Sequence, residues 1–356
     1  MKLWRLDASG QLHLLLSLTN RTFDPVQGHR DSESERYFPW PLVQMPAGEF
    51  YSLKAGKNTH FPPGTIDGSG ERILRHAGSL VRLTAGDYYE YVHHFNETDG
   101  SAPSTLILAA DGFLYGSTAS GGNPGPLNPP VLPPGGNCPP GSGHYAYAYT
   151  RPGGYPLLSE EEEQRRAQQH FEYLTQPQPR YPGGCGVLFR FVPDQGLDVL
   201  HCFSGEDGAH PVGQLLLTRD GSLYGTTLKG GLHDCGTLYR FDFLRGLTVL
   251  HSFTPEEGRC RFGVTEANNG DVVGTTAPED ITEYWHGGMV FRYRPTQGFT
   301  VLHRFECVQD LQKKKSYFPN GRHPSHKLVA GPGNRLYGFT SGGGIRFNGT
   351  FFSIEP

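Results

Sequence analysis

The residues best suited to chemistry lie between positions 279 and 286, in a segment that combines acidic side chains with an aromatic ring and an imidazole. They are Glu279, Asp280, Glu283, Trp285 and His286. Paired carboxylates are the groups that glycoside hydrolysis places on either side of the bond, and carboxylates also hold hard cations. Asp280, Glu283 and His286 are therefore the candidate catalytic residues. Their spacing matches no established motif, so a solvated acidic loop is the simpler interpretation.

Aromatic residues in loop-like segments are candidate ligand-binding residues. Trp40 lies in FPWP and Trp285 in EYWHGG, while Tyr145 and Tyr147 alternate at the end of a stretch rich in Pro and Gly. A ring with an apolar face and a polar edge suits stacking on a sugar or anchoring a protein partner. The alternative is that these rings pack their loops against the rest of the molecule.

Histidines fall into two groups. Four recur at one place in a repeated phrase, which indicates a packing role, namely His94, His201, His251 and His303. His210 and His323 instead precede a proline in connecting segments, and we count them, with His286, among the candidate ligand-binding residues. The sequence has no phosphate loop, nucleophile motif or metal-finger spacing. We therefore predict no cofactor and no metal.

These residues are positioned by a sequence phrase that occurs several times. From Leu215 it reads LLLTRDGSLYGTT, then a Gly-Gly loop, then GTLYRF and GLTVLHSF ending at Phe253. Alternating apolar runs separated by Gly turns predict four short strands, at Leu215 to Thr218, Leu223 to Thr227, Thr237 to Phe241 and Leu247 to Phe253. A unit of about 50 residues with four antiparallel strands is the blade of a β-propeller.

The number of times each strand pattern occurs predicts the number of blades in the ring. The second-strand and fourth-strand signatures each occur five times, but the third-strand signature occurs six times, at both Trp4 to Leu6 and Phe351 to Ile354. We predict one all-β domain over residues 1–356, with five four-stranded blades. The last blade would take its outer strand, Leu12 to Leu18, from the N-terminus. Six blades, one of them incomplete, is the alternative.

The repeated unit resembles a known family. Its pattern, DGxLYGTTxxGG followed by GTLYRF and GLTVLHSF, is similar to the GloVer tandem repeat of bacterial choice-of-anchor surface proteins, and more distantly to kelch blades. The resemblance covers Leu106 to Phe352. It implies a propeller fold, and it implies display on a cell surface or secretion. The N-terminal sequence MKLWRLDASG lacks the apolar core of a signal peptide, and we see no anchor segment.

Composition narrows the function classes. Among 356 residues there are 49 Gly and 29 Pro, which favour many turns over helices. A net charge of −4 shows no excess of the positive charge that binds nucleic acid. No apolar run approaches the ~18 residues of a membrane span. The six Cys allow a bridge between Cys138 and Cys185, or six free thiols.

Every predicted insertion lies on one face of the disc, because each follows a second or a fourth strand. The insertions are residues 19–41, 55–78, 119–184, 277–288 and 306–323. Within 119–184, in the second blade, a capping-box spacing at Ser159 predicts a helix over about 157–175. Functional residues concentrate on loops held by a rigid scaffold, so we place the site on this face, at the mouth of the central channel.

We predict a non-catalytic binding propeller for a glycan or another small polar ligand. One alternative is a protein-interaction scaffold, in which the insertion helix and the loop from Lys313 to Lys315 contact a protein partner. The other is a glycan-active enzyme with its site at the channel mouth. Propellers host all three functions, so the fold alone does not choose between them.

Overall fold

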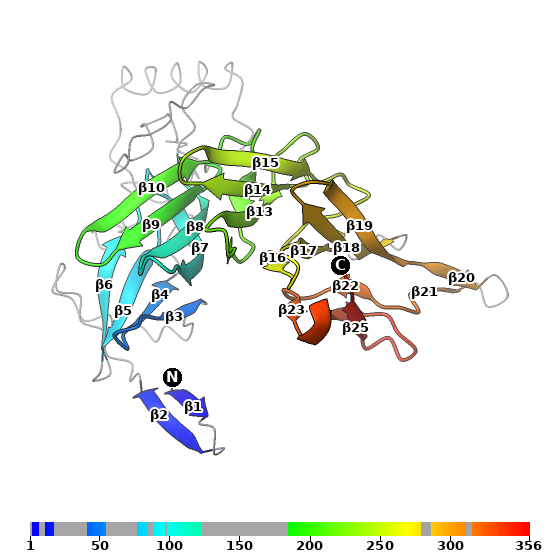
Figure 1. Cartoon of the computed structure of the whole chain (residues 1–356), viewed down its shortest axis with the longest axis horizontal. Coiled ribbons are helices and arrows are strands. Elements are labelled where there is room, and N and C mark those ends of the chain that lie inside the picture. Colours follow the sequence, from blue (N-terminus) through cyan, green and yellow to red (C-terminus); the bar gives the residue numbers. More distant parts are fainter. Residues whose placement is uncertain are drawn as a thin grey trace, which may run out of the picture.

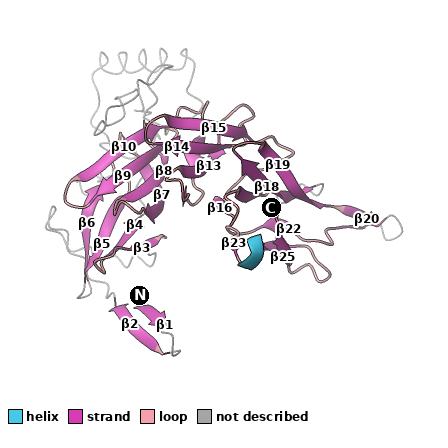
Figure 2. Ribbon diagram, viewed as in Figure 1, coloured by secondary structure: helices cyan, strands magenta, loops and turns pink. Residues whose placement is uncertain are grey.

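The protein is built from β-strands that follow one another around an arc, as the computed structural model shows (Figures 1 and 2). It describes residues 2–6, 11–17, 41–54, 77–84, 88–96, 98–122, 184–278, 286–310 and 315–356. The described chain forms β-strands and one short 3-10 helix, η1 (Pro332–Asn334). No helix in this part of the chain is long and apolar enough to cross a membrane.

Five antiparallel sheets, called blades I to V here, make up the arc. Blade I contains β3 (Leu42–Gln44), β4 (Phe50–Lys54), β5 (Ser79–Thr84) and β6 (Tyr88–His94). Blade II contains β7 (Ser101–Leu108), β8 (Leu114–Ser120), β9 (Val187–Val192) and β10 (Gly196–Cys202). Blade III contains β11 (Ala209–Pro211), β12 (Leu216–Leu217), β13 (Leu223–Lys229), β14 (Thr237–Asp242) and β15 (Gly246–Ser252).

Blade IV contains β16 (Val264–Glu266), β17 (Val272–Thr276), β18 (His286–Arg294) and β19 (Gly298–Glu306). Blade V contains β22 (Arg322–Pro324), β23 (Val329–Ala330), β24 (Leu336–Gly342) and β25 (Phe351–Ile354). Two hairpins stand apart from the blades, β1 (Lys2–Leu6) with β2 (Leu12–Ser17), and β20 (Val308–Asp310) with β21 (Lys315–Tyr317). The predicted all-β fold with four-stranded propeller blades is confirmed.

Local sequence explains where the strands turn. In blade III, the Asp220 carboxylate accepts hydrogen bonds from the Thr218 hydroxyl at 2.5 Å and the Ser222 amide at 3.1 Å. Gly221 between them has φ +82°, a backbone conformation that side chains disfavour. The same Asp–Gly pair recurs in blade II, where Asp111 accepts from the Phe113 amide at 2.9 Å. These turns hold the first and second strands together, as the sequence predicts.

The glycine of the LYG phrase has a packing role. A Cβ added to Gly225 would lie 2.2 Å from the Tyr239 hydroxyl, and one added to Gly274 would lie 2.5 Å from the ring tip of Phe291. Each glycine faces its aromatic partner across the second and third strands of one blade. The second strand therefore lacks a side chain where the third strand carries its largest ring.

The hydrophobic core is divided into layers between consecutive blades. In each layer, a third-strand aromatic of one blade packs on buried apolar residues of the preceding blade. The pairs are Phe189 with Leu80, Tyr239 with Leu188, Phe291 with Leu238, and Phe352 with Val290. In Figure 1 the first strands lie on the inner side of the arc and the fourth strands on its outer side.

The predicted closure of the ring is wrong for the described strands. Leu12–Ser17 pairs with Lys2–Leu6 in a separate two-stranded sheet and not with the last blade. Phe351–Ile354 is the third strand of blade V, paired with β24. Closing a short local hairpin costs less chain entropy than joining segments from opposite ends of the sequence. Blade V therefore has no fourth strand among the described residues.

The predicted cysteine states are also corrected. Cys185, Cys235, Cys260 and Cys307 are free thiols, so the bridge proposed between Cys138 and Cys185 does not form. Cys202 is disulfide-bonded, which excludes six free thiols as well. Burial raises the pKa of the Cys185 thiol to about 12 and that of Cys260 to about 11.

Candidate functional site

A histidine–carboxylate pair closes the connection from one blade to the next. The histidine Nε2 atom near the end of the fourth strand lies within hydrogen-bonding distance of an acid six residues later. The pairs are His93 with Asp99 at 2.9 Å, His201 with Asp207 at 2.7 Å, and His251 with Glu257 at 2.8 Å. Each carboxylate also accepts a hydrogen bond from the backbone amide three residues before it, at Asn96, Ser204 and Thr254.

In blade III, the histidine–carboxylate pair shifts the pKa of its acid. Burial alone would raise the pKa of the Glu257 carboxyl, but hydrogen bonds from His251 and the Thr254 amide hold that pKa below its ordinary value. The His251 ring also meets the Phe253 ring edge-on, with centroids 5.2 Å apart. The pair therefore fixes a loop and packs a core ring, which confirms the structural interpretation of the repeated histidines at His201 and His251.

One of the four predicted repeat histidines is misplaced by one residue. His93, and not His94, pairs across the ladder with Leu80, as His201 pairs with Leu188. His94 instead shares a hydrogen bond with the Ser79 hydroxyl at 2.9 Å and stacks on Tyr91. A bulge in the ladder between the third and fourth strands decides which of the two adjacent histidines faces the acid.

Blade IV departs from the pattern. His303 pairs across the ladder with Val290, as the other repeat histidines do with their partners, and its ring meets Phe305 edge-on at 4.8 Å. The residue six positions later, however, is Gln309, in the β20–β21 hairpin. Among the described side chains, none forms a hydrogen bond or ion pair with the His303 ring. Within the described residues, its ring nitrogens therefore have no protein partner.

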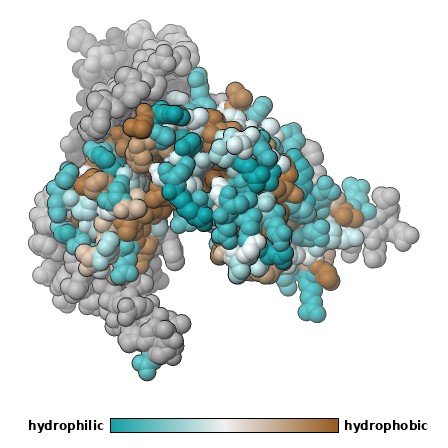
Figure 3. Space-filling model, viewed as in Figure 1, coloured by the Kyte–Doolittle hydropathy of each residue, from teal (hydrophilic) through white to brown (hydrophobic). Residues whose placement is uncertain are grey.

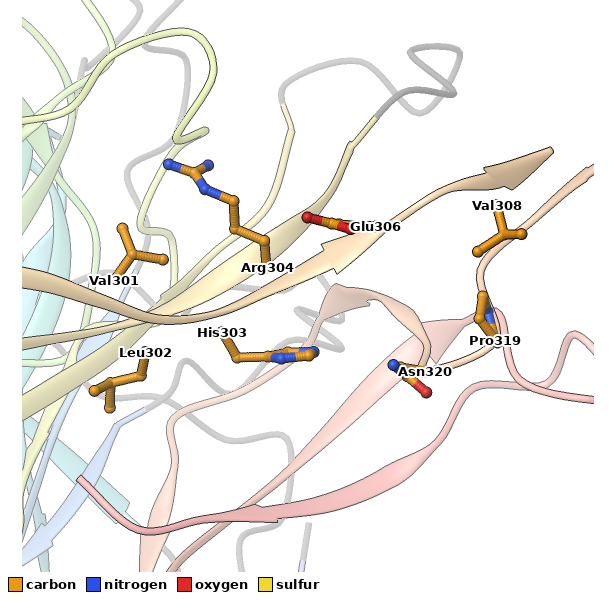
Figure 4. Close-up of a pocket in the computed structure, with 8 residues that line it drawn as sticks. All are labelled: Val301, Leu302, His303, Arg304, Glu306, Val308, Pro319 and Asn320. Atoms are coloured by element: carbon orange, nitrogen blue, oxygen red, sulfur yellow. The ribbon is translucent and has the colours of Figure 1, made fainter.

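A hollow of about 440 Å³ lies beside this histidine (Figure 4). It is lined by Val301, Leu302, His303, Arg304, Glu306, Val308, Pro319 and Asn320. In Figure 4, Arg304 and Glu306 lie on one side of β19 and His303 on the other, while Asn320 approaches from the loop before β22. The lining combines an imidazole, a guanidinium, a carboxylate and an amide with apolar groups.

Among the described residues, no fourth strand of blade V covers this position, so space remains there. Fourth strands of successive blades contact one another from β6 to β10, β15 and β19. In blade III, the face of the His251 ring is covered by Phe299 of the next blade, with centroids 3.6 Å apart and planes within 2° of parallel. Blade V offers no equivalent among its described residues, so His303 lacks that cover.

The acidic segment singled out in the sequence ends at this hollow. His286 begins β18 and pairs across the ladder with Glu306, one of the lining residues. Its side chain lies outside the described residues, as do Asp280, Glu283 and Trp285. The structure therefore brings the backbone at His286, the end of the candidate catalytic loop, beside the hollow.

The other candidate residues are not gathered there. Trp40, Tyr145, Tyr147 and the helix predicted over 157–175 lie outside the described residues. His210 and His323 occupy the first strands of blades III and V, with φ +56° and +54°. Burial lowers the pKa of His210. Because Ala102 in blade II has φ +53° at the equivalent place, the backbone requires this conformation whatever the side chain.

The sequence pattern does not single out His303, because this histidine shares its place in the repeat with the packing histidines. A signal was present in the sequence, since acids occupy positions 99, 207 and 257 but glutamine occupies 309. In the described chain, no cluster of three or more His, Cys, Asp or Glu side chains is placed to hold a metal ion.

Solved structures similar to this chain have varied functions. Virginiamycin B lyase from Staphylococcus aureus, with quinupristin, is 12% identical, with a TM-score of 0.44 over 93% of this chain and 75% of that one. A protein of unknown function from Dyadobacter fermentans is 12% identical, with a TM-score of 0.46 over 91% and 80%. The PQQ-bound aldose sugar dehydrogenase from Streptomyces coelicolor is 12% identical, with a TM-score of 0.44 over 99% and 87%.

Sequence comparison identifies the repeat itself. No curated protein matches the chain. Residues 178–352 match the family model described as the Gloeobacter/Verrucomicrobia repeat. These residues cover the last strands of blade II and blades III to V, where the phrase repeats most clearly. The resemblance to the GloVer repeat is therefore confirmed over residues 178–352, which are similar to the Gloeobacter/Verrucomicrobia repeat.

Proposed function

We propose that this propeller is a non-catalytic binding protein and that the hollow at His303 takes a glycan or another small polar ligand. The observation that carries the proposal is the broken histidine–carboxylate pattern. Blades I to III use the imidazole to hold a loop, whereas blade IV leaves it without a protein partner among the described residues, beside an open space.

The lining chemistry suits a polyhydroxylated ligand. Sugar hydroxyls both donate and accept hydrogen bonds, and so do the His303 ring and the Asn320 amide, which lie on the same side of β19. Val308 and Pro319 add apolar surface for the C–H groups of a sugar ring. A volume of about 440 Å³ lies within the range of roughly 300–1,000 Å³ that ligand pockets span.

Binding is favoured over glycoside hydrolysis by the carboxylate content of the hollow. Glycosidases place two carboxyl groups roughly 5–10 Å apart across the bond that breaks. Glu306 is the single acid among the lining residues described. The lining residues therefore support recognition of a ligand without supplying both acids of a hydrolase.

The test is a glycan-array screen of the full chain, followed by titration of the strongest hit into variants. His303→Ala should weaken binding about tenfold or more, since it removes a hydrogen bond to the ligand. His210→Ala is the matched control, because it removes an imidazole from the first strand of another blade. Thermal unfolding of each variant verifies that the fold is kept.

Two results would contradict the proposal. Full affinity in the folded His303→Ala variant would remove the hollow as the site. Loss of affinity in His210→Ala with none in His303→Ala would place the site at the channel mouth, as the sequence alone predicts.

A further inference from the structure

Blade V exposes a face that every other blade buries. Leu80, Leu188, Leu238 and Val290 stand at equivalent places in the third strands of blades I to IV, and all are 0% exposed. The equivalent residue of blade V is Phe351, which is 62% exposed. Phe339, directly across the ladder from Phe351, is 57% exposed.

Large apolar side chains seldom stay this exposed when they lie side by side in a sheet. On the face shown in Figure 3, hydrophobic residues are interspersed with hydrophilic ones. In blades I to IV the equivalent face is covered by the third-strand aromatic of the next blade, such as Tyr239 over Leu188. Among the described residues, no further blade covers this face of blade V.

The β1–β2 hairpin has the pairing of the outer half of a blade. In blade III, Leu238 pairs with His251, the register then shifts by one residue, and Tyr239 pairs with Val249. Blades I, II and IV shift at the same place. In the hairpin, Leu3 pairs with Leu16, the register shifts, and Trp4 pairs with Leu14. Trp4 thus occupies the register position of the third-strand aromatics.

We propose that the β1–β2 hairpin is half of a sixth blade and that it stacks on the exposed face of blade V. The register gives Trp4 the position that Tyr239 and Phe352 hold in their blades, and a blade with this register would follow the face of blade V that carries Phe351. In Figure 1 the hairpin lies on the open side of the arc formed by blades I to V. The occupant is this chain's own N-terminus, because it carries both the blade register and the missing aromatic.

This arrangement differs from adding β2 to the edge of β25. A hairpin stacked on the face of blade V leaves the fourth-strand position of that blade empty. The hollow at His303 consequently remains open, so the proposed ligand site and the docked hairpin are compatible.

The test is amide hydrogen exchange of the full chain, read by mass spectrometry in residues 2–17 and 336–354. Phe351→Glu should speed exchange in the hairpin about tenfold or more, because a charge replaces apolar contact area. Trp4→Glu should speed exchange in β25 by a similar factor. Leu244→Glu is the matched control, since Leu244 is 95% exposed on the turn before β15 and should change neither segment.

Light scattering at the same concentrations identifies the occupant. The proposal is supported if the protein is a monomer, Phe351→Glu speeds exchange in the hairpin, and Trp4→Glu speeds exchange in β25. Hairpin exchange that is unchanged by Phe351→Glu would overturn it. A wild-type dimer that dissociates in both variants would also overturn it, because a second copy would then cover blade V.

Discussion

Replacing His251 with alanine should destabilise the protein far more than replacing His303, although the two histidines hold equivalent places. The His251 Nε2 atom donates a hydrogen bond to the Glu257 carboxylate at 2.8 Å, and the His251 ring lies flat on Phe299 with centroids 3.6 Å apart. A hydrogen bond to a charged group contributes about 1.5–3 kcal/mol, and a stacked ring pair contributes about 0.5–1.5 kcal/mol. The expected loss in free energy of unfolding is therefore about 2–4 kcal/mol.

His303 has neither partner among the described residues. It keeps its edge contact with Phe305, so His303→Ala should cost only about 1 kcal/mol. The assay is urea unfolding of both variants, followed by circular dichroism and tryptophan fluorescence, with coincident transitions required. A double-mutant cycle with Glu257→Ala should show a coupling energy of about 1.5–3 kcal/mol in magnitude, that of one charged hydrogen bond.

Acid should reduce the difference in stability loss between His251→Ala and His303→Ala. The pKa of the Glu257 carboxyl is depressed in the folded protein, so its contribution is present above the ordinary carboxyl value of ~4.3 and is lost as pH falls through the lower folded value. The cost of His251→Ala should consequently shrink as pH is lowered from about 6 towards 3. Equal losses for His251→Ala and His303→Ala at neutral pH would refute the reasoning.

Three further outcomes are expected. Gly225→Ala should lower the free energy of unfolding by about 1–3 kcal/mol, measured in urea, because its Cβ would overlap the buried third-strand ring; an unchanged midpoint would contradict this packing role. Cys307 should react with iodoacetamide before Cys260, whose thiol pKa burial raises to about 11, and peptide mapping that shows the reverse order would count against it. Asp271→Asn should cost about 1–3 kcal/mol at pH 7, since Arg294 donates two hydrogen bonds to that carboxylate. Because Arg294 also holds the Asp271 pKa below its ordinary value, that cost should fall in acid, and a cost independent of pH would exclude the ion pair as its source.

Strand positions could be predicted from the sequence because their signals are local. The Asp220–Gly221 turn and the LYG phrase each act within one blade, through contacts between near neighbours. The histidine of blade I was placed one residue too late because a bulge, which has no signature in the His93–His94 pair, sets the register.

Ring closure could not be predicted in the same way. Whether Leu12–Ser17 joins Lys2–Leu6 or the last blade depends on competition between a local and a distant partner. The hollow at His303 depends on one local feature and one that arises from tertiary structure. The missing acid at Gln309 is visible in the sequence, whereas the empty fourth-strand position beside it is a consequence of tertiary structure.

We propose that the blade IV imidazole, which has no partner among the described residues, marks the ligand site. The most direct measurement is the affinity of the folded His303→Ala variant, relative to wild type and His210→Ala, for the strongest ligand found on a glycan array. We expect the affinity for this ligand to fall about tenfold or more in His303→Ala and to stay unchanged in His210→Ala. Equal affinity of His303→Ala and wild type would contradict it.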